Sequence, residues 1–218
     1  NPRACVFMSI ELNGVRAANI DTDAQNKVVR SVNPVVFDIY SEVPVDEKKR
    51  AQAIQSAASD TSLTGSSDYI QPKDARIERA ARSIAGTHAD TLAIARAISR
   101  WVEIRMKRDE TLAITRSVDL LATPVGGRDE YVKLFTALSR SVGIPTQINM
   151  GLVYEGDRFK YHSWPSILAR GVWHDLDPWY GQETADAARV SLVRGDFDCL
   201  SEYLRLVDSF SVRILDYR

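Results

Sequence analysis

Few side chains in this sequence are suited to covalent or metal chemistry. The histidines are His88, His162 and His174, and no cysteine lies near any of them in the chain. A zinc site draws three or four such ligands from short, regular spacings. The sequence therefore indicates no metal site, and nothing in it indicates a cofactor.

The two cysteines, Cys5 and Cys199, lie near opposite ends of the chain. They could form one disulfide in an exported protein, or remain two ordinary thiols. Because a free cysteine is commonly buried as a small apolar side chain, we favour the thiols. The chain opens at Asn1 rather than at a methionine. We therefore expect an upstream targeting segment to be missing from it, and we lean towards an exported, periplasmic location.

Composition narrows the classes of function. The net charge of -1 leaves no basic surplus to neutralise phosphates, so we expect no nucleic-acid partner. No apolar run approaches the roughly 20 residues that a membrane helix needs, so we expect no membrane span. The sequence carries no signal for the oligomeric state. What remains is a protein with one well-buried core and a small N-terminal addition.

Strand and helix patterns alternate in the first third of the chain. Residues 5–12 and 34–40 are rich in β-branched and aromatic side chains, which predicts two strands. Residues 46–58 predict a polar helix that begins at Asp46. The stretch that follows is rich in Ser, Thr and Gly, as linkers are. We therefore divide the chain into an N-terminal β-rich segment (1–58), a linker (59–67) and a main domain (68–218).

The main domain opens with helices and then changes to strands. Asp74 and Gly86 are suited to begin and end a first helix, and a second helix carries Trp101. A third helix is expected over 128–142, since its apolar residues follow helical spacing. That stripe consists of Tyr131, Leu134, Phe135, Leu138 and Val142. Alternating patterns over 146–155, 159–168 and 172–176 then predict antiparallel strands, and helices followed by strands indicate an α+β fold.

One stretch of this domain carries a recognisable signature. Residues 126–145 read GGRDEYVKLFTALSRSVGIP, residues 161–164 read YHSW, and residues 173–178 read WHDLDP. In order and spacing these motifs resemble those of bacterial transglutaminase-like proteins of the papain-type cysteine protease superfamily. The resemblance covers about two thirds of the chain, from residue 68 onward. It implies a papain-like core in which helices pack on an antiparallel sheet.

The resemblance also implies where a catalytic triad would lie. In active relatives, a cysteine at the start of the helix attacks an amide carbonyl. A histidine on a neighbouring strand serves as its base, and an aspartate orients that histidine. His162 and Asp177 match these two roles, whereas Arg128 stands at the position of the cysteine. A guanidinium stays protonated and has no lone pair to offer a carbonyl carbon, so Arg128 cannot be the nucleophile.

We therefore expect a degenerate triad in a non-catalytic domain, a pseudoenzyme. Such a domain would bind a peptide or protein partner through the inherited active-site cleft, and Arg128 would recognise a carboxylate. One rival is an active cysteine peptidase, amidase or transglutaminase, whose nucleophile is supplied elsewhere, for example by Cys199, or in which Arg128 replaces a native cysteine. Another is a structural module of a larger assembly. The residues expected to bind are Arg128, Glu130, Tyr131, Trp164, Trp179 and Tyr180.

Each of these residues also has an ordinary structural interpretation. A lone histidine in a strand, such as His162, is usually satisfied within the core, and an Asp-Pro pair is often only a turn. Trp164, Trp173 and Trp179 are typical core residues, although Trp179 and Tyr180 could line a groove. His174 is expected at the surface.

Overall fold

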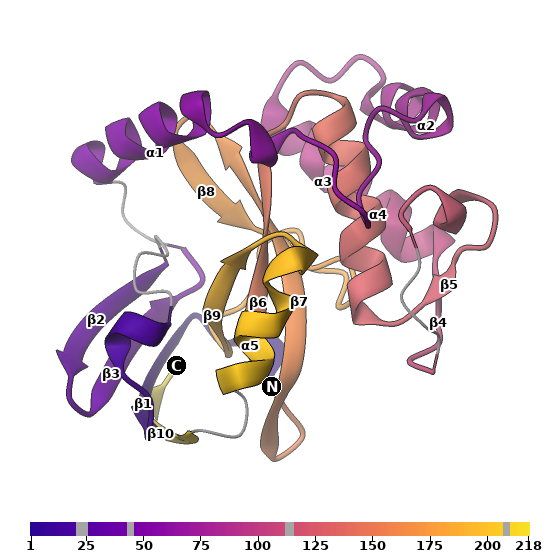
Figure 1. Cartoon of the computed structure of the whole chain (residues 1–218). Coiled ribbons are helices and arrows are strands. Elements are labelled where there is room, and N and C mark those ends of the chain that lie inside the picture. Colours follow the sequence, from indigo (N-terminus) through magenta and orange to yellow (C-terminus); the bar gives the residue numbers. More distant parts are fainter. Residues whose placement is uncertain (21–25, 43–45, 112–115, 207–209) are drawn as a thin grey trace. The chain divides into compact units, whose positions relative to one another are not determined.

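The computed structural model describes residues 1–20, 26–42, 46–111, 116–206 and 210–218. Figure 1 shows the helices and strands, coloured along the sequence. The chain divides into two compact units, neither of which is continuous in sequence. The first unit comprises Asn1–Val45, Asn149–Ser163 and Ala185–Arg218, and the second comprises Asp46–Ile148 and Trp164–Thr184. The predicted division at residues 59–67 concerns which segments fold independently, and it stays a prediction.

An antiparallel sheet of order β10-β1-β3-β2 dominates the first unit. Side chains of β1 alternate between the core and the outer face: Met8, Ile10 and Leu12 are buried. Residues of β3 opposite them are buried in the same way, so one face of the sheet forms core. The strands are β1 (Phe7–Asn13), β2 (Lys27–Val32), β3 (Val35–Tyr40) and β10 (Ser211–Tyr217).

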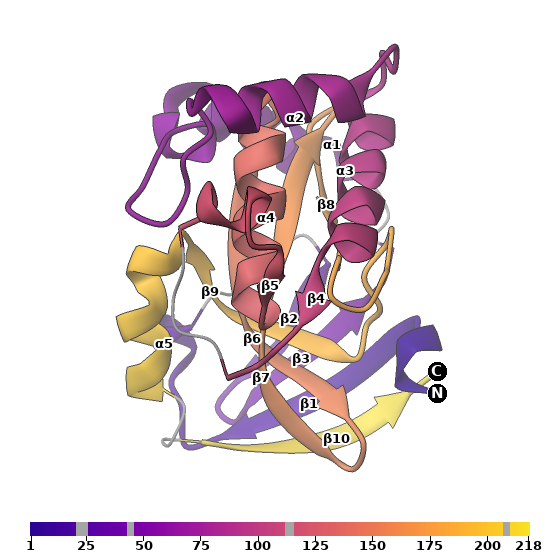
Figure 2. The same ribbon diagram turned by 90° about the vertical axis from the view of Figure 1, so that its right-hand side faces the viewer.

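The two ends of the chain meet in this unit. The N–H of Val6 donates to the carbonyl oxygen of Arg218 at 2.8 Å, and the ends lie side by side in Figure 2. The first unit also contains β9 (Arg189–Gly195) and the short helix α5 (Leu200–Leu206). Lys27 on β2 donates to the carbonyl oxygen of Ser191 on β9 at 2.8 Å, which ties these strands together.

Four helices build most of the second unit, and three of them, α2, α3 and α4, pack against one another. Helices α1, α2 and α3 are preceded by Asp46, Asp74 and Asp90, respectively. The carboxylate of each aspartate accepts a backbone N–H of the first helical turn and so fixes where the helix begins. Gly86, with φ at +52°, ends α2. The helices are α1 (Glu47–Ser59), α2 (Ala75–Ala85), α3 (Thr91–Arg105) and α4 (Arg128–Ser141).

Two short strands directly precede α4 in the sequence, and three longer strands follow directly after it. Before the helix, β4 (Lys107–Arg108) pairs in parallel with β5 (Val125–Gly126). After it come β6 (Thr146–Glu155), β7 (Arg158–Ala169) and β8 (Val172–Asp175), in a sheet of order β8-β7-β6-β9. Strands β6 and β7 each run from one unit into the other.

The predicted helices and the strands from residue 146 to 176 are present, so the α+β class is confirmed. Strands β2, β9 and β10 and helix α5 were not predicted. No helix within the described residues combines the length and the apolar character needed to span a membrane.

Candidate functional site

A tight glycine connection positions Arg128 as the first residue of α4. A Cβ on Gly126 would lie 2.3 Å from the Cβ of Glu130, so only glycine fits at this position. Glu130 in turn accepts the N–H of Gly127 through Oε2 at 2.9 Å, which caps the helix. Strand β5 therefore leads directly into α4, and Arg128 is the first residue of the helix.

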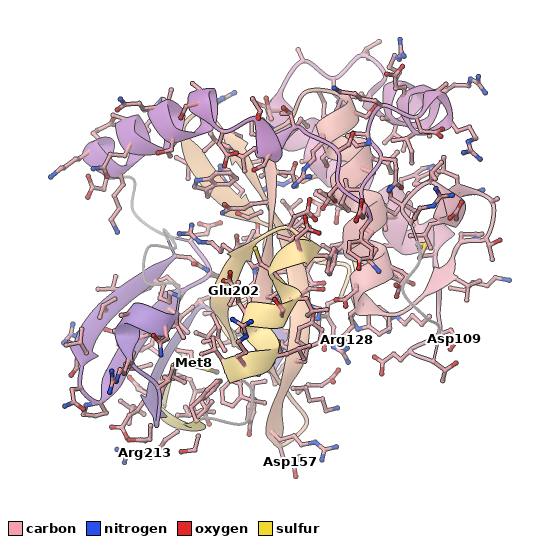
Figure 3. The ribbon with its side chains drawn as sticks, in the orientation of Figure 1. Met8, Asp109, Arg128, Asp157, Glu202 and Arg213 are labelled. Atoms are coloured by element: carbon pink, nitrogen blue, oxygen red, sulfur yellow. The ribbon has the colours of Figure 1, made fainter. Side chains whose placement is uncertain are left out.

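The guanidinium of Arg128 is held by polar and aromatic groups from two segments, the residue after β4 and the loop that contains Trp179 and Tyr180. Its Nε lies 3.0 Å from Oε1 of Glu110, just after β4. Its Nη1 donates to the hydroxyl oxygen of Tyr180 at 2.9 Å, and its carbon lies 5.7 Å from the centre of that ring. Only 14% of the Arg128 side chain is exposed, against 58% for Glu110. Figure 3 labels Arg128 and Asp109, and Asp109 is the residue before Glu110 in the sequence.

The indole ring of Trp179 packs against the guanidinium groups of two arginines. The guanidinium of Arg128 lies 5.1 Å from its ring centre and that of Arg108 lies 4.7 Å from it, both within the range of cation–π attraction. Arg108 also donates to the Trp179 carbonyl oxygen. Tyr131 meets the indole edge-on at 5.1 Å. Two cations therefore converge on one buried ring.

The loop that presents Trp179 and Tyr180 depends on Asp177. The Asp177 carboxylate accepts the N–H of Trp179 at 3.1 Å and that of Tyr180 at 3.2 Å. Main-chain hydrogen bonds with Gln182, at 2.8 and 2.9 Å, close the loop. Asp177 is buried. Asp177 therefore shapes the turn that carries Trp179 and Tyr180. This is the structural role that is common for an Asp-Pro pair.

His162 lies on the part of β7 that belongs to the first unit, and its side chain is fully buried. Arg128 and Asp177 belong to the second unit. The pairing of His162 with Asp177 in a degenerate triad therefore stays a prediction.

Three of the residues expected to bind are packed inside the second unit. Glu130 pairs with Lys133 at 2.8 Å, and both side chains are buried. Tyr131 donates its hydroxyl to the carbonyl oxygen of Met106 at 2.9 Å, and burial raises its pKa. Trp164 donates its indole N–H to the Asp175 carboxylate at 3.1 Å. These contacts give Glu130, Tyr131 and Trp164 structural roles and leave Arg128 and Tyr180 as the more accessible groups.

Two members of this site, Arg108 and Glu110, were not identified from the sequence. Arg108 contacts Trp179, which lies 71 positions later, and Glu110 contacts Arg128, which lies 18 positions later. No short motif joins residues at such separations, so only the folded chain reveals them.

Cys5 and Cys199 are both free thiols, and both lie in the first unit. Burial raises the pKa of Cys5 and of Cys199, so both thiols are held in their less nucleophilic form. Within the described parts of the chain, no cluster of three or more His, Cys, Asp or Glu side chains is placed to hold a metal ion.

Comparison with known proteins identifies this architecture. Residues 78–178 match the family model of the transglutaminase-like superfamily, a range that contains Arg128, His162 and Asp177. This stretch of the chain therefore matches a transglutaminase-like domain, in agreement with the resemblance of its motifs. No curated protein shows a significant match.

One solved structure agrees with this chain at the level of the fold, and two others are less similar. A candidate cysteine protease from Cytophaga hutchinsonii superposes with a TM-score of 0.55 at 12% identity, over 98% of this chain and 86% of that one. The periplasmic domain of TgpA from Pseudomonas aeruginosa gives a TM-score of 0.48 at 14% identity, over 82% and 76%. A candidate protease from Parabacteroides distasonis gives 0.41 at 12%, over 78% and 37%. Together, the family match and the first of these structures support a transglutaminase-like α+β fold for this chain.

Proposed function

We propose that this chain is a non-catalytic transglutaminase-like domain that binds a peptide or protein partner by recognising a carboxylate with Arg128. One observation carries the proposal. At the start of α4, where active relatives are expected to hold a nucleophilic cysteine, the side chain is a guanidinium already paired with the Glu110 carboxylate at 3.0 Å. A guanidinium cannot attack a carbonyl, but it forms strong, directional hydrogen bonds to carboxylates.

The surroundings of Arg128 support recognition rather than catalysis. Trp179 and the Tyr180 hydroxyl hold the guanidinium in place, so little rotamer freedom is lost when a ligand binds. The helix N-terminus adds partial positive charge, which also favours an anion. The rival nucleophile, Cys199, has its pKa raised by burial, the opposite of what an activated thiol requires.

A titration of paired peptides tests the proposal. Acetylated tetrapeptides that end in each of the common residues are prepared with a free C-terminal carboxylate and, as a matched set, with an amidated end. We expect the wild type to prefer the acids and Arg128→Ala to lose that preference by about 10-fold or more, as expected for a hydrogen bond to a charged group. Arg128→Lys should fall between them, since it keeps the charge but not the planar fork.

Arg82→Ala is the matched control, because Arg82 lies on α2, is largely exposed and is paired with Glu78. It should bind like the wild type. Equal affinity of the wild type for the acids and the amides, or unchanged affinity in Arg128→Ala, contradicts the proposal. An exported or periplasmic location also stays a prediction, to be tested by cell fractionation.

A further inference from the structure

The carboxylate of Glu110 already occupies a hydrogen-bonding position on Arg128. The two side chains differ in how firmly they are held. Arg128 is 14% exposed and is fixed by Tyr180 and Trp179, whereas Glu110 is 58% exposed. An exposed carboxylate that leaves an ion pair regains its hydration at little cost. A nearly buried guanidinium loses more than an exposed carboxylate when the two separate, so its exchange is favoured when another carboxylate takes the place of the first.

The backbone around Glu110 is anchored independently of its side chain. The N–H of Asp109 donates to the carbonyl oxygen of Gly126 at 2.9 Å. The Asp109 carboxylate accepts the hydroxyl and the N–H of Thr111 at 2.6 and 2.9 Å, and these hydrogen bonds lower its pKa. The Glu110 side chain can therefore turn away from Arg128 while the main chain on both sides stays in place.

We infer that Glu110 stands in for the ligand, its carboxylate filling the place on Arg128 that a peptide carboxylate takes on binding. The inference rests on the proposed function. It adds that the carboxylate of the ligand replaces the carboxylate of Glu110 on Arg128. The charge of Arg128 stays paired throughout the exchange. Glu110 thereby weakens binding, because only the fraction of molecules with Glu110 displaced is competent.

The test compares small carboxylates across variants by nuclear magnetic resonance. N-acetylglycine represents a peptide C-terminus, the α-amide of N-acetylglutamate represents an acidic side chain, and N-acetylglycinamide is the neutral control. The side-chain Nε–Hε signal of Arg128 and the indole signal of Trp179 report binding. Glu110→Gln removes the competing charge, and Glu202→Gln removes the same charge from an exposed position on α5 in the first unit.

We expect Glu110→Gln to bind at least one of the acids about 2- to 5-fold more tightly than the wild type, the range that an exposed ion pair supplies. Glu202→Gln should bind the acids with the same affinity as the wild type. N-acetylglycinamide should not bind to the wild type or to any of the variants. If Glu110→Gln binds no more tightly while Arg128→Ala loses binding, Glu110 is not a competitor but the proposed function stands. If Arg128→Ala binds like the wild type, or if no acid binds even to Glu110→Gln, both are overturned.

Discussion

The guanidinium of Arg128 lies 5.1 Å from the centre of the Trp179 indole ring, and that of Arg108 lies 4.7 Å from the same centre. Trp179 is 5% exposed, and Tyr131 covers its edge. The aromatic ring thus offsets part of the repulsion between two cations while holding both near the start of α4. The proposed recognition by Arg128 and the stability of the unit therefore depend on the same residue, Trp179.

Trp179 should consequently be far more important for stability than its neighbour. We expect Trp179→Ala to lower the free energy of unfolding by about 3–5 kcal/mol, the usual cost of truncating a buried tryptophan. Tyr180→Ala removes a half-buried ring and should cost much less. Urea denaturation followed by circular dichroism measures both. A similar loss for the two variants would show that Trp179 is not the anchor described here.

The buried pair of Glu130 and Lys133 leads to a second stability prediction. Their side chains are 6% and 1% exposed and lie 2.8 Å apart. Lys133→Met leaves the Glu130 carboxylate buried without its cation, which should cost about 3–5 kcal/mol. The double variant Glu130→Gln with Lys133→Met removes both charges while keeping an acceptor for the N–H of Gly127, so it should recover a large part of that loss. Additive losses in urea denaturation would contradict this coupling.

A thiol introduced at residue 128 should be reactive. Arg128 is the first residue of α4, and a helix N-terminus favours a thiolate. We expect the thiol of Arg128→Cys to react with iodoacetamide at neutral pH several-fold faster than Cys199, whose pKa is raised by burial. Peptide mapping by mass spectrometry gives the rate for each cysteine. Labelling of Cys199 at the same rate or faster would show that the start of α4 does not activate a thiol.

Alkaline pH should destabilise the first unit through Tyr203. Burial raises the pKa of Tyr203 from 10.0 to about 12. Between these values the unfolded chain releases the proton and the folded chain keeps it, so stability is lost as the pH rises from 10 to 12, by about 1.4 kcal/mol per pH unit. Tyr203→Phe should lose less over this range than the wild type, whereas Tyr217→Phe, at an exposed position, should not differ from it. Equal losses in all three, measured by urea denaturation at each pH, would be inconsistent with a buried Tyr203.

The helices and the central strands were predictable because their signals are local. The apolar stripe from Tyr131 onward and the glycines before Arg128 predict α4 to within one residue of its observed end at Ser141. Asp46 and Asp74 predict the starts of α1 and α2 through capping.

The rest of the fold depends on distant pairing. Strand β2 lies at the edge of its sheet and exposes Val28 and Val32, so its pattern is not that of a buried strand. Strand β10 finds its place only through β1, at the other end of the chain. The same holds for the site. The motifs predicted Arg128 and Tyr180 as binding residues, which stays a prediction, whereas Arg108 and Glu110 lie beside these residues only through tertiary contacts.

The central claim, that this domain performs no acyl transfer, is tested most directly by intact-mass spectrometry. The protein is incubated with peptide amide substrates, quenched in acid and weighed, with His162→Ala treated in parallel. We predict no acyl adduct on any residue and no release of amine above the level of the His162→Ala sample. An acyl adduct that forms on the wild type and is lost in His162→Ala would contradict the claim.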